Sequence, residues 1–187
     1  MRIGEILALT KNDIDFENNL IIINKTISKD KNGNNIIGKT TKTYESTRTI
    51  PITMQIKAVL LDAITNYIPN NYGLLFVLPN GKIIDHATIN SQLKRICKNL
   101  NIKTKPCKIK SHGKLIDGTT SNVNTHMLRH TYATRCIESG MQPVVLSRLL
   151  GHKNISITLN TYTNVFNQFK QNALDQYEKY MQNIWLP

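Results

Sequence analysis

Two glycines divide the last third of the sequence into segments of helix length. The stretch "HMLRHTYATRCIES" ends at Gly140, and glycine favours the left-handed conformation that commonly follows a helix. The next stretch, "PVVLSRLLG", has Pro143 in its first turn, where proline is tolerated, and ends at Gly151. The last two segments, "ISITLNTYTNVF" and "FKQNALDQYEKYMQNIW", are also predicted to be helical. The chain from residue 126 onward is therefore predicted to be a set of helices.

The N-terminal part of the sequence predicts a mixture of helices and strands. Residues 2–9 have helical apolar spacing, and "LIIINKTIS" and "STRTIPI" read as strands on either side of the turn-rich tip "KDKNGNN". Thr53 and Asp85 are placed to cap two helices, the first of which stops near Pro69. "LLFVLPNGK" reads as a short strand and turn, and residues 103–124 read as a polar loop. The predicted fold class is α+β, mainly α, with a small antiparallel sheet near the N-terminus.

The charge balance narrows the class of partner. The 187 residues, enough for one domain, include 24 Lys and Arg against 12 Asp and Glu, a net charge of +12. Such a surplus favours a polyanion, either nucleic acid or an anionic membrane surface. No apolar run approaches the roughly 18 residues that span a bilayer, and "MRIGEILALT" is unlike a secretory signal. We therefore expect a cytoplasmic protein that binds no membrane.

The positive charge is concentrated in one region. Residues 94–129 contain nine Lys and Arg and the single acid Asp117, so this region is a candidate phosphate-binding surface. A solvated basic loop is the alternative. The candidate DNA-contacting residues are Lys94, Arg95, Lys98, Lys103, Lys105, Lys108 and Lys110.

Metal chemistry finds little support in the residue pattern. The three cysteines form no C-x-x-C spacing, so neither a disulfide framework nor a cysteine zinc site is predicted. His126 and His130 have the spacing by which two histidines reach one zinc ion, but a hydrolytic zinc helix would have Glu where Met127 stands. The spacing of His126 and Arg129 instead places both on one helical face. We therefore predict no metal site.

Short motifs elsewhere in the chain join this pair. "RIGEILALT" contains Arg2, "TKTYESTRTIPI" contains Lys42, and "HMLRH" is followed by "LLGH" and "TLNTYTNV". Tyr162 lies ten residues after His152 of the "LLGH" motif. In this order, and over essentially the whole chain, the motifs resemble those of the catalytic domain of the tyrosine recombinases, also called the phage integrase family. The resemblance implies that residues 1–187 form such a catalytic domain.

The resemblance also implies a set of site residues. Arg2 matches the first catalytic arginine. Lys42 matches the lysine of the β-hairpin and is preferred to Lys39, because Lys42 lies six residues before Arg48, as in the family pattern. The implied catalytic residues are Arg2, Lys42, His126, Arg129, His152 and the nucleophile Tyr162.

Transfer of a DNA phosphodiester explains why these residue types are needed. Two arginines bind the non-bridging oxygens bidentately and stabilise the charge that builds in the transition state. By the resemblance, Lys42 donates a proton to the departing 5′ oxygen, His126 assists proton transfer at the tyrosine, and His152 hydrogen-bonds the phosphate. Tyr162 forms a covalent 3′-phosphotyrosyl link that conserves the bond energy for rejoining. This chemistry requires no metal and no cofactor.

The resemblance predicts the larger assembly as well. The implied partner is double-stranded DNA, on which the intact protein forms a homo-tetramer. Family members have chain before the first arginine, including a core-binding domain, so we expect the catalytic domain here to be N-terminally truncated. Residues 167–187 are predicted to form a helix, either exchanged between protomers or docked on its own domain, with an apolar stripe of Phe169, Leu174, Tyr177, Tyr180 and Met181.

Two other functions fit part of the pattern. A non-catalytic DNA-binding remnant would bind duplex DNA through the basic segment without cutting it, and a metal-dependent nuclease would lose cleavage when a chelator is added. A covalent protein–DNA adduct that is absent in Tyr162→Phe distinguishes a recombinase from both.

Overall fold

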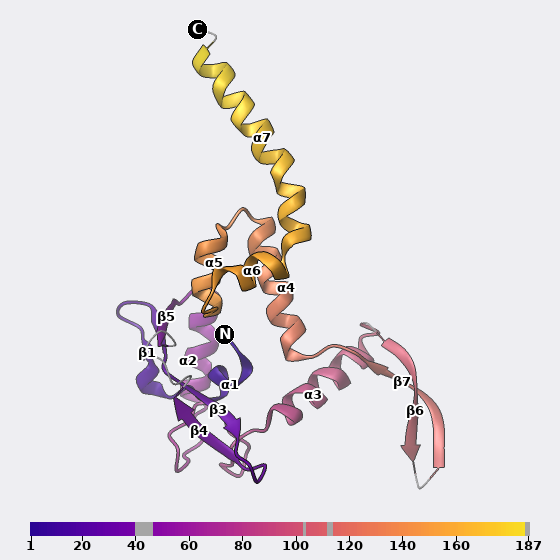
Figure 1. Cartoon of the computed structure of the whole chain (residues 1–187). Coiled ribbons are helices and arrows are strands. Elements are labelled where there is room, and N and C mark those ends of the chain that lie inside the picture. Colours follow the sequence, from indigo (N-terminus) through magenta and orange to yellow (C-terminus); the bar gives the residue numbers. More distant parts are fainter. Residues whose placement is uncertain (40–46, 103, 112–113, 186–187) are drawn as a thin grey trace. The chain divides into compact units, whose positions relative to one another are not determined.

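The computed structural model describes residues 1–39, 47–102, 104–111 and 114–185 (Figure 1). The chain divides into an N-terminal unit, Met1–Arg129, and a C-terminal unit, His130–Pro187. Each unit is described by itself below. Helices with small antiparallel sheets make up the structure, so the predicted fold class is confirmed.

Antiparallel pairing organises the strands of the N-terminal unit. The described strands are β1 (Ile14–Asp15), β2 (Leu20–Ile23), β3 (Lys25–Lys29), β4 (Asn35–Lys39), β5 (Arg48–Pro51), β6 (Thr104–Ser111) and β7 (Lys114–Ser121). They form a sheet of order β1-β2-β5, a β3-β4 hairpin and a β6-β7 ribbon.

The sequence predicted one long strand where the structure has two. "LIIINKTIS" is divided at Asn24, so that β2 pairs with β5 while β3 pairs with β4. Burial explains the division, because Ile21 of β2 and Ile27 of β3 lie in different hydrophobic clusters. The predicted tip is a turn between β3 and β4, with Gly33 at a φ of 82°.

Three α-helices lie wholly within the described part of the N-terminal unit. They are α1 (Ile3–Leu7), α2 (Met54–Thr65) and α3 (His86–Asn99), with a 3-10 turn, η1 (Lys11–Asp13), after the first. Both predicted caps are confirmed. The Thr53 hydroxyl accepts from Ile56 N at 3.4 Å, and the Asp85 carboxylate accepts from Ala87 N at 3.1 Å.

The short strand predicted in "LLFVLPNGK" is absent from the described elements. Leu74 and Val77 form only isolated bridges, with Thr10 and Ile83. Leu74 and Leu75 are nevertheless buried, so the apolar pattern indicated residues of the hydrophobic core and not a paired β-strand.

Helix α1 lies directly against strand β3. A Cβ atom at Gly4 would lie 2.5 Å from the Thr26 hydroxyl and 2.6 Å from the Ile27 carbonyl, closer than atoms can approach. Leu7 and Ala8 are buried in the same cluster as Ile27. The first turn of α1, which carries Arg2 and Glu5, is thus held at a fixed distance from the sheet.

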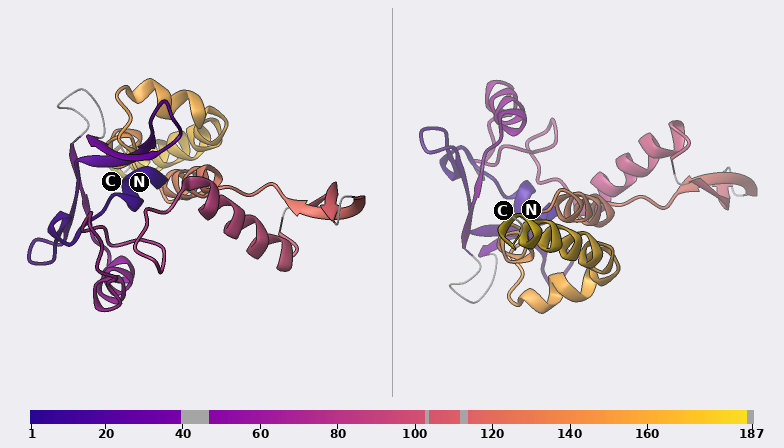
Figure 2. Two further views of the ribbon diagram at one scale, coloured as in Figure 1. Left: turned by 90° about the horizontal axis from the view of Figure 1, so that it is seen from below. Right: turned by 90° about the horizontal axis from the view of Figure 1, so that it is seen from above.

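The prediction of a loop at residues 103–124 is wrong. Strands β6 and β7 form a two-stranded antiparallel ribbon with Ile109 opposite Ile116 and Lys108 opposite Asp117 (Figure 1). The two views of Figure 2 show the ribbon extending beyond the end of α3. The composition misled because a two-stranded ribbon buries little apolar surface, so it lacks the hydrophobic alternation of a strand in a packed sheet.

Four helices form the described part of the C-terminal region. They are α4 (Thr125–Glu138), which crosses the border between the units, α5 (Pro143–Leu150), α6 (Ile155–Thr161) and α7 (Thr163–Trp185). The helix boundaries at Gly140 and Gly151 are confirmed, with φ values of 85° and 66°. The core of the C-terminal unit contains Ala133, Cys136, Ile137, Leu146, Leu150 and Tyr162.

The last helix is long and continuous (Figure 1). Four of its described apolar side chains, Leu174, Tyr177, Tyr180 and Ile184, are exposed, and Met181 is half-buried. Within the residues searched, no helix combines the length and the hydropathy needed to cross a membrane.

Candidate active site

A buried carboxylate organises the start of the N-terminal unit. Glu5 is 2% exposed and accepts two parallel hydrogen bonds from Arg48, at 3.0 Å and 2.7 Å. Arg2 donates to the same carboxylate through its backbone N–H at 2.7 Å and through Nη1 at 3.1 Å. The Arg2 and Glu5 contacts arise because residues three apart face each other across the first turn of a helix. One acid therefore holds two arginines from distant parts of the chain.

The environment keeps Glu5 ionised. Burial by itself raises the pKa of a carboxyl group, because it disfavours the charged form. The hydrogen bonds from Arg48 and from the Arg2 backbone, together with the two guanidinium charges, outweigh burial and lower the pKa of Glu5 below 4.5. Near neutral pH the carboxylate is therefore a permanent negative charge beside the two arginines.

The charge of Arg129 affects the amino group of Met1, at the start of the N-terminal unit. The pKa of the Met1 amino group falls from 8.0 to about 6, first through burial and next through the charge of Arg129. Arg48 and Arg2 lower this pKa further, and Glu5 opposes them. Three guanidinium charges thus lower the pKa of the Met1 amino group, and the Glu5 carboxylate opposes them. This excess of positive charge suits the binding of an anion.

Helix α4 is fixed where it carries His126 and Arg129. The Asn124 side chain accepts from Met127 N at 3.0 Å and so caps the helix, and Asn90 of α3 accepts from Thr125 N at 2.9 Å. His126 is exposed, whereas Arg129 is half-buried with its Nη1 atom shielded from solvent. Both residues lie on one helix with the spacing that the sequence predicted.

His152 is oriented by a buried threonine of the C-terminal unit. It follows Gly151, the left-handed C-cap of α5, and its backbone N–H donates to the Ser147 carbonyl at 3.1 Å. Its Nδ1 atom lies 2.7 Å from the hydroxyl of Thr158, a side chain with no exposed surface. A hydrogen bond at Nδ1 orients the imidazole ring and leaves Nε2 as the nitrogen on its other side.

Tyr162 is packed in the core of the C-terminal unit. It is the C-cap of α6, is 5% exposed, and lies in one cluster with Leu146 and Leu150. Its hydroxyl lies 3.2 Å from Nδ1 of His130, with the two ring centroids 6.0 Å apart. The hydroxyl is thus directed at a histidine of helix α4 while the ring stays buried.

The structure brings the predicted residues together in two groups. Arg2 and Arg129 belong to the N-terminal unit, with His126 on the same helix as Arg129, whereas His152 and Tyr162 belong to the C-terminal unit. Convergence of the two groups around one phosphate stays a prediction. Lys42 lies outside the described residues.

Sequence reasoning assigned no role in this site to four residues that the structure places in its contacts. Predicted residues are contacted directly by Glu5, His130 and Thr158, whereas Arg48 contacts Glu5. Glu5 was detectable in principle, because an acid three residues after Arg2 on a helix predicts an ion pair. Arg48 and Thr158 carry no comparable local signal, since each meets its partner through the fold.

The candidate DNA-contacting residues are only partly described. Lys94, Arg95 and Lys98 are exposed on α3, and Lys105 is exposed on β6. Lys103 lies outside the described residues, as do the side chains of Lys108 and Lys110.

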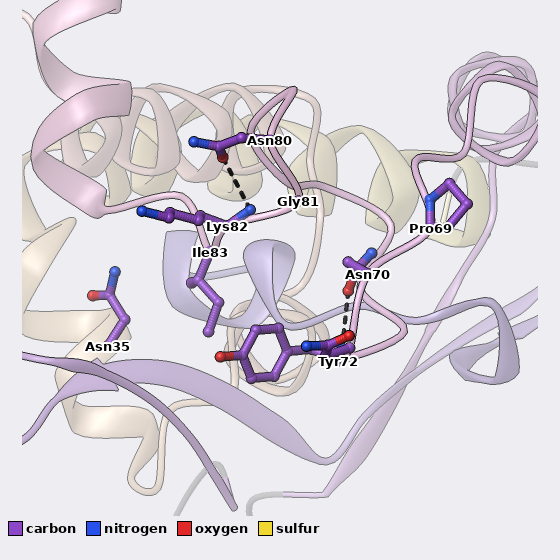
Figure 3. Close-up of a pocket in the computed structure, with 9 residues that line it drawn as sticks. Asn35, Pro69, Asn70, Tyr72, Asn80, Gly81, Lys82 and Ile83 are labelled. Carbon is purple, nitrogen blue, oxygen red and sulfur yellow. Dashed lines mark hydrogen bonds between the residues drawn. The ribbon is translucent and has the colours of Figure 1, made fainter.

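A separate pocket of about 510 Å³ lies beside β4 (Figure 3). Asparagines dominate its lining, and Tyr72 and Lys82 project toward it. Two of the asparagines serve turns, since Asn70 accepts from Leu74 N and Asn80 accepts from Lys82 N. None of the predicted site residues lines this pocket.

Comparisons with known proteins place these observations in a family. A tyrosine recombinase XerC-like protein of Caldanaerobacter subterraneus subsp. tengcongensis is 30% identical over 94% of this chain and 45% of its own length. The integrase of Staphylococcus phage L54a is 30% identical over 96% of this chain and 48% of its own length. The structure of the Tn1549 transposon integrase in complex with circular intermediate DNA superimposes with a TM-score of 0.70 at 29% identity, covering 87% of this chain and 51% of that one.

The chain thus spans about half the length of the relatives it matches. The sequence pattern of the phage integrase family matches residues 1–168, which include every predicted catalytic residue. The chain belongs to the phage integrase family.

Proposed function

We propose that this chain is the catalytic domain of a site-specific DNA recombinase that cleaves and rejoins double-stranded DNA through a tyrosine nucleophile. The observation that carries the proposal is the pair of guanidinium groups, Arg2 and Arg48, that both bind the buried carboxylate of Glu5 at the start of α1. Phosphoryl transfer depends chiefly on positioning and on stabilising charge at the phosphate oxygens, and fixed guanidinium groups supply both. The relatives are named recombinases, integrases and transposases, which supports the same reaction.

In the proposed reaction the Tyr162 oxygen attacks the scissile phosphorus and the bond from phosphorus to the 5′ oxygen breaks. Arg2 and Arg129 neutralise the non-bridging oxygens, and Lys42 gives its proton to the leaving 5′ oxygen. The product is a 3′-phosphotyrosyl link and a free 5′ hydroxyl. Attack by a 5′ hydroxyl of another strand reverses the step and releases the enzyme.

The two histidine contacts of the C-terminal unit refine this scheme. His130 lies 3.2 Å from the Tyr162 hydroxyl, so it is a proton acceptor within reach, a role that the resemblance assigns to His126. Thr158 holds Nδ1 of His152, which makes Nε2 the ring nitrogen for the phosphate. A tyrosine hydroxyl in water has a pKa near 10, so a tyrosine nucleophile needs such neighbours to react at neutral pH.

DNA is the proposed partner, with a homo-tetramer as the complete assembly. Solved structures similar to this chain are named as complexes with transposon DNA, which supports DNA binding. The exposed cations of α3 and β6 provide charge for such contacts. The cytoplasmic location predicted from the sequence is part of this proposal, because a recombinase must reach DNA.

A nicked suicide substrate tests the proposed function. The incubation should yield a covalent protein–DNA adduct that resists denaturation, forms in the presence of chelator, and is absent in Tyr162→Phe. Tyr177→Phe, which alters an exposed tyrosine of α7, is the matched control and should retain the adduct. Retarded DNA mobility without any adduct would instead support a non-catalytic DNA-binding remnant.

A further inference from the structure

The ion pair between Arg48 and Glu5 joins segments that are 43 residues apart in the sequence. Arg48 opens strand β5 and donates Nη1 to one carboxylate oxygen and Nη2 to the other. The two side chains are 11% and 2% exposed, so the pair is shielded from solvent. This two-pronged geometry is available to arginine and not to lysine, whose ammonium is a single point.

The same carboxylate is the partner of Arg2. The Arg2 side chain is 51% exposed, and an exposed ion pair by itself fixes a side chain only weakly. Because Arg48 binds both oxygens of the Glu5 carboxylate, it fixes the position of the group to which Arg2 donates. The order of Arg2 therefore depends on a residue that need not touch the phosphate.

Arg48 pairs with Ile23 in the β2-β5 register and also forms the ion pair with Glu5. Arg48 is thus held by backbone pairing and by its buried side chain together.

We propose that Arg48 is a positioning residue for strand cleavage, which holds Arg2 in place through Glu5. The inference rests on the proposed function, in which Arg2 receives its role. A purely structural ion pair would affect the stability of the fold and leave the rate on bound DNA unchanged. A positioning pair changes that rate even in a folded variant that still binds DNA.

Arg48→Lys tests the proposal, because it keeps the charge and removes the two-pronged contact. The rate of adduct formation in a single turnover at saturating suicide substrate should fall about 10- to 100-fold, the range that a displacement near 1 Å can cause. DNA affinity, measured separately, should change by less than about threefold, since many lysines contribute to it. Arg135→Lys is the matched control, because Arg135 forms a surface pair with Glu138 at 2.6 Å and is 76% exposed. Its rate should equal that of the parent chain.

A second measurement does not depend on activity. In a protein labelled with ¹⁵N-arginine, the Nε–H signal of Arg2, identified by its loss in Arg2→Lys, should shift in Arg48→Lys and stay in place in Arg135→Lys. If the parent chain forms no adduct, the proposed function fails, while this signal still decides whether Arg48 positions Arg2. With an active parent chain, a slow rate with an unmoved signal, or a moved signal with an unchanged rate, overturns the proposal. Should Arg48→Lys lose its cooperative thermal transition, Glu5→Gln is the second variant, with the same expected results.

Discussion

Two buried acids of the N-terminal unit are held ionised by their neighbours. For Glu5, burial raises the pKa, but hydrogen bonds from Arg48 and Arg2 lower it more. For Asp13, burial likewise raises the pKa, and contacts from Lys25 and Thr10 lower it below 3.8. A carboxyl group with a depressed folded-state pKa stabilises the fold above its unfolded pKa, and this stability is lost as the pH falls through the folded value.

We therefore expect two declines in the free energy of unfolding on acidification. The Met1 amino group, whose pKa is lowered to about 6 in the fold, causes the first between about pH 8 and pH 6, and the two carboxyl groups cause the second below about pH 4.5. Urea unfolding at a series of pH values measures this profile. Glu5→Gln should be less stable at neutral pH and should show a shallower decline below pH 4.5, because its side chain no longer titrates. A stability that rises on acidification would contradict this assignment of charges.

Thr158 provides a second test at the scale of a residue. Thr158→Val keeps the shape of the buried side chain and removes the hydroxyl 2.7 Å from His152 Nδ1. We expect the rate of adduct formation to fall about 10-fold or more, since a misoriented imidazole no longer meets the phosphate. Thr161→Val is the control, because the Thr161 hydroxyl is exposed and bonds only locally to the Ile157 carbonyl. Equal effects of the two substitutions would exclude a specific role for Thr158.

At the scale of secondary structure, local signals predicted well what local chemistry determines. The caps at Thr53 and Asp85 and the helix end at Gly151 follow from backbone groups that only nearby side chains satisfy. Strand partners were less predictable, because β2 and β3 are contiguous in sequence and diverge only when distant clusters bury Ile21 and Ile27. The β6-β7 ribbon was missed for the related reason that its pairing, rather than its burial, defines it.

The same distinction applies to the candidate site. Motif spacing selected the candidate residues from Arg2 to Tyr162, because helical spacing and a fixed order can be read in a linear sequence, and their roles stay a prediction. The buried pair of Arg48 with Glu5 and the contact of Thr158 with His152 depend on tertiary packing. No local window of the sequence contains Arg48 and Glu5 together.

The contact between α1 and β3 gives a prediction for an element. Gly4→Ala would place a methyl group 2.5 Å from the Thr26 hydroxyl and 2.6 Å from a backbone carbonyl, so α1 must move. We expect a loss of about 1–3 kcal/mol of stability, as overpacking typically causes. Adduct formation should weaken as well, because Arg2 and Glu5 move with the helix. Gly38→Ala in β4, where no atom lies within 4 Å of the added Cβ, should leave both thermal stability and rate nearly unchanged.

At the scale of the whole molecule, the net charge of +12 and the apolar stripe of α7 concern association. In the proposed function this positive charge attracts the chain to DNA, and salt should weaken the contact because it restores counterions. Charge alone gives neither the number of protomers nor their order on the duplex. A stripe of exposed apolar side chains on a long helix can supply that contact between copies.

Truncation after Val165 tests how α7 works. Leu174, Tyr177, Tyr180 and Ile184 are 56–63% exposed on this helix, so within the single chain their apolar surface gains little from burial. This exposure favours a groove on a neighbouring protomer, and on that basis the shortened chain should keep its thermal transition and bind DNA. It should fail to form higher assemblies on a DNA site that holds several copies, as seen by analytical ultracentrifugation of the complexes. In the untruncated chain, changing both Tyr177 and Tyr180 to Ser should cause the same loss of assembly. The control changes Glu178 and Lys179, two exposed polar residues on the same turn of the helix, to Gln, and it should leave assembly unchanged. A lowered melting temperature with unchanged assembly would show instead that α7 docks on its own domain.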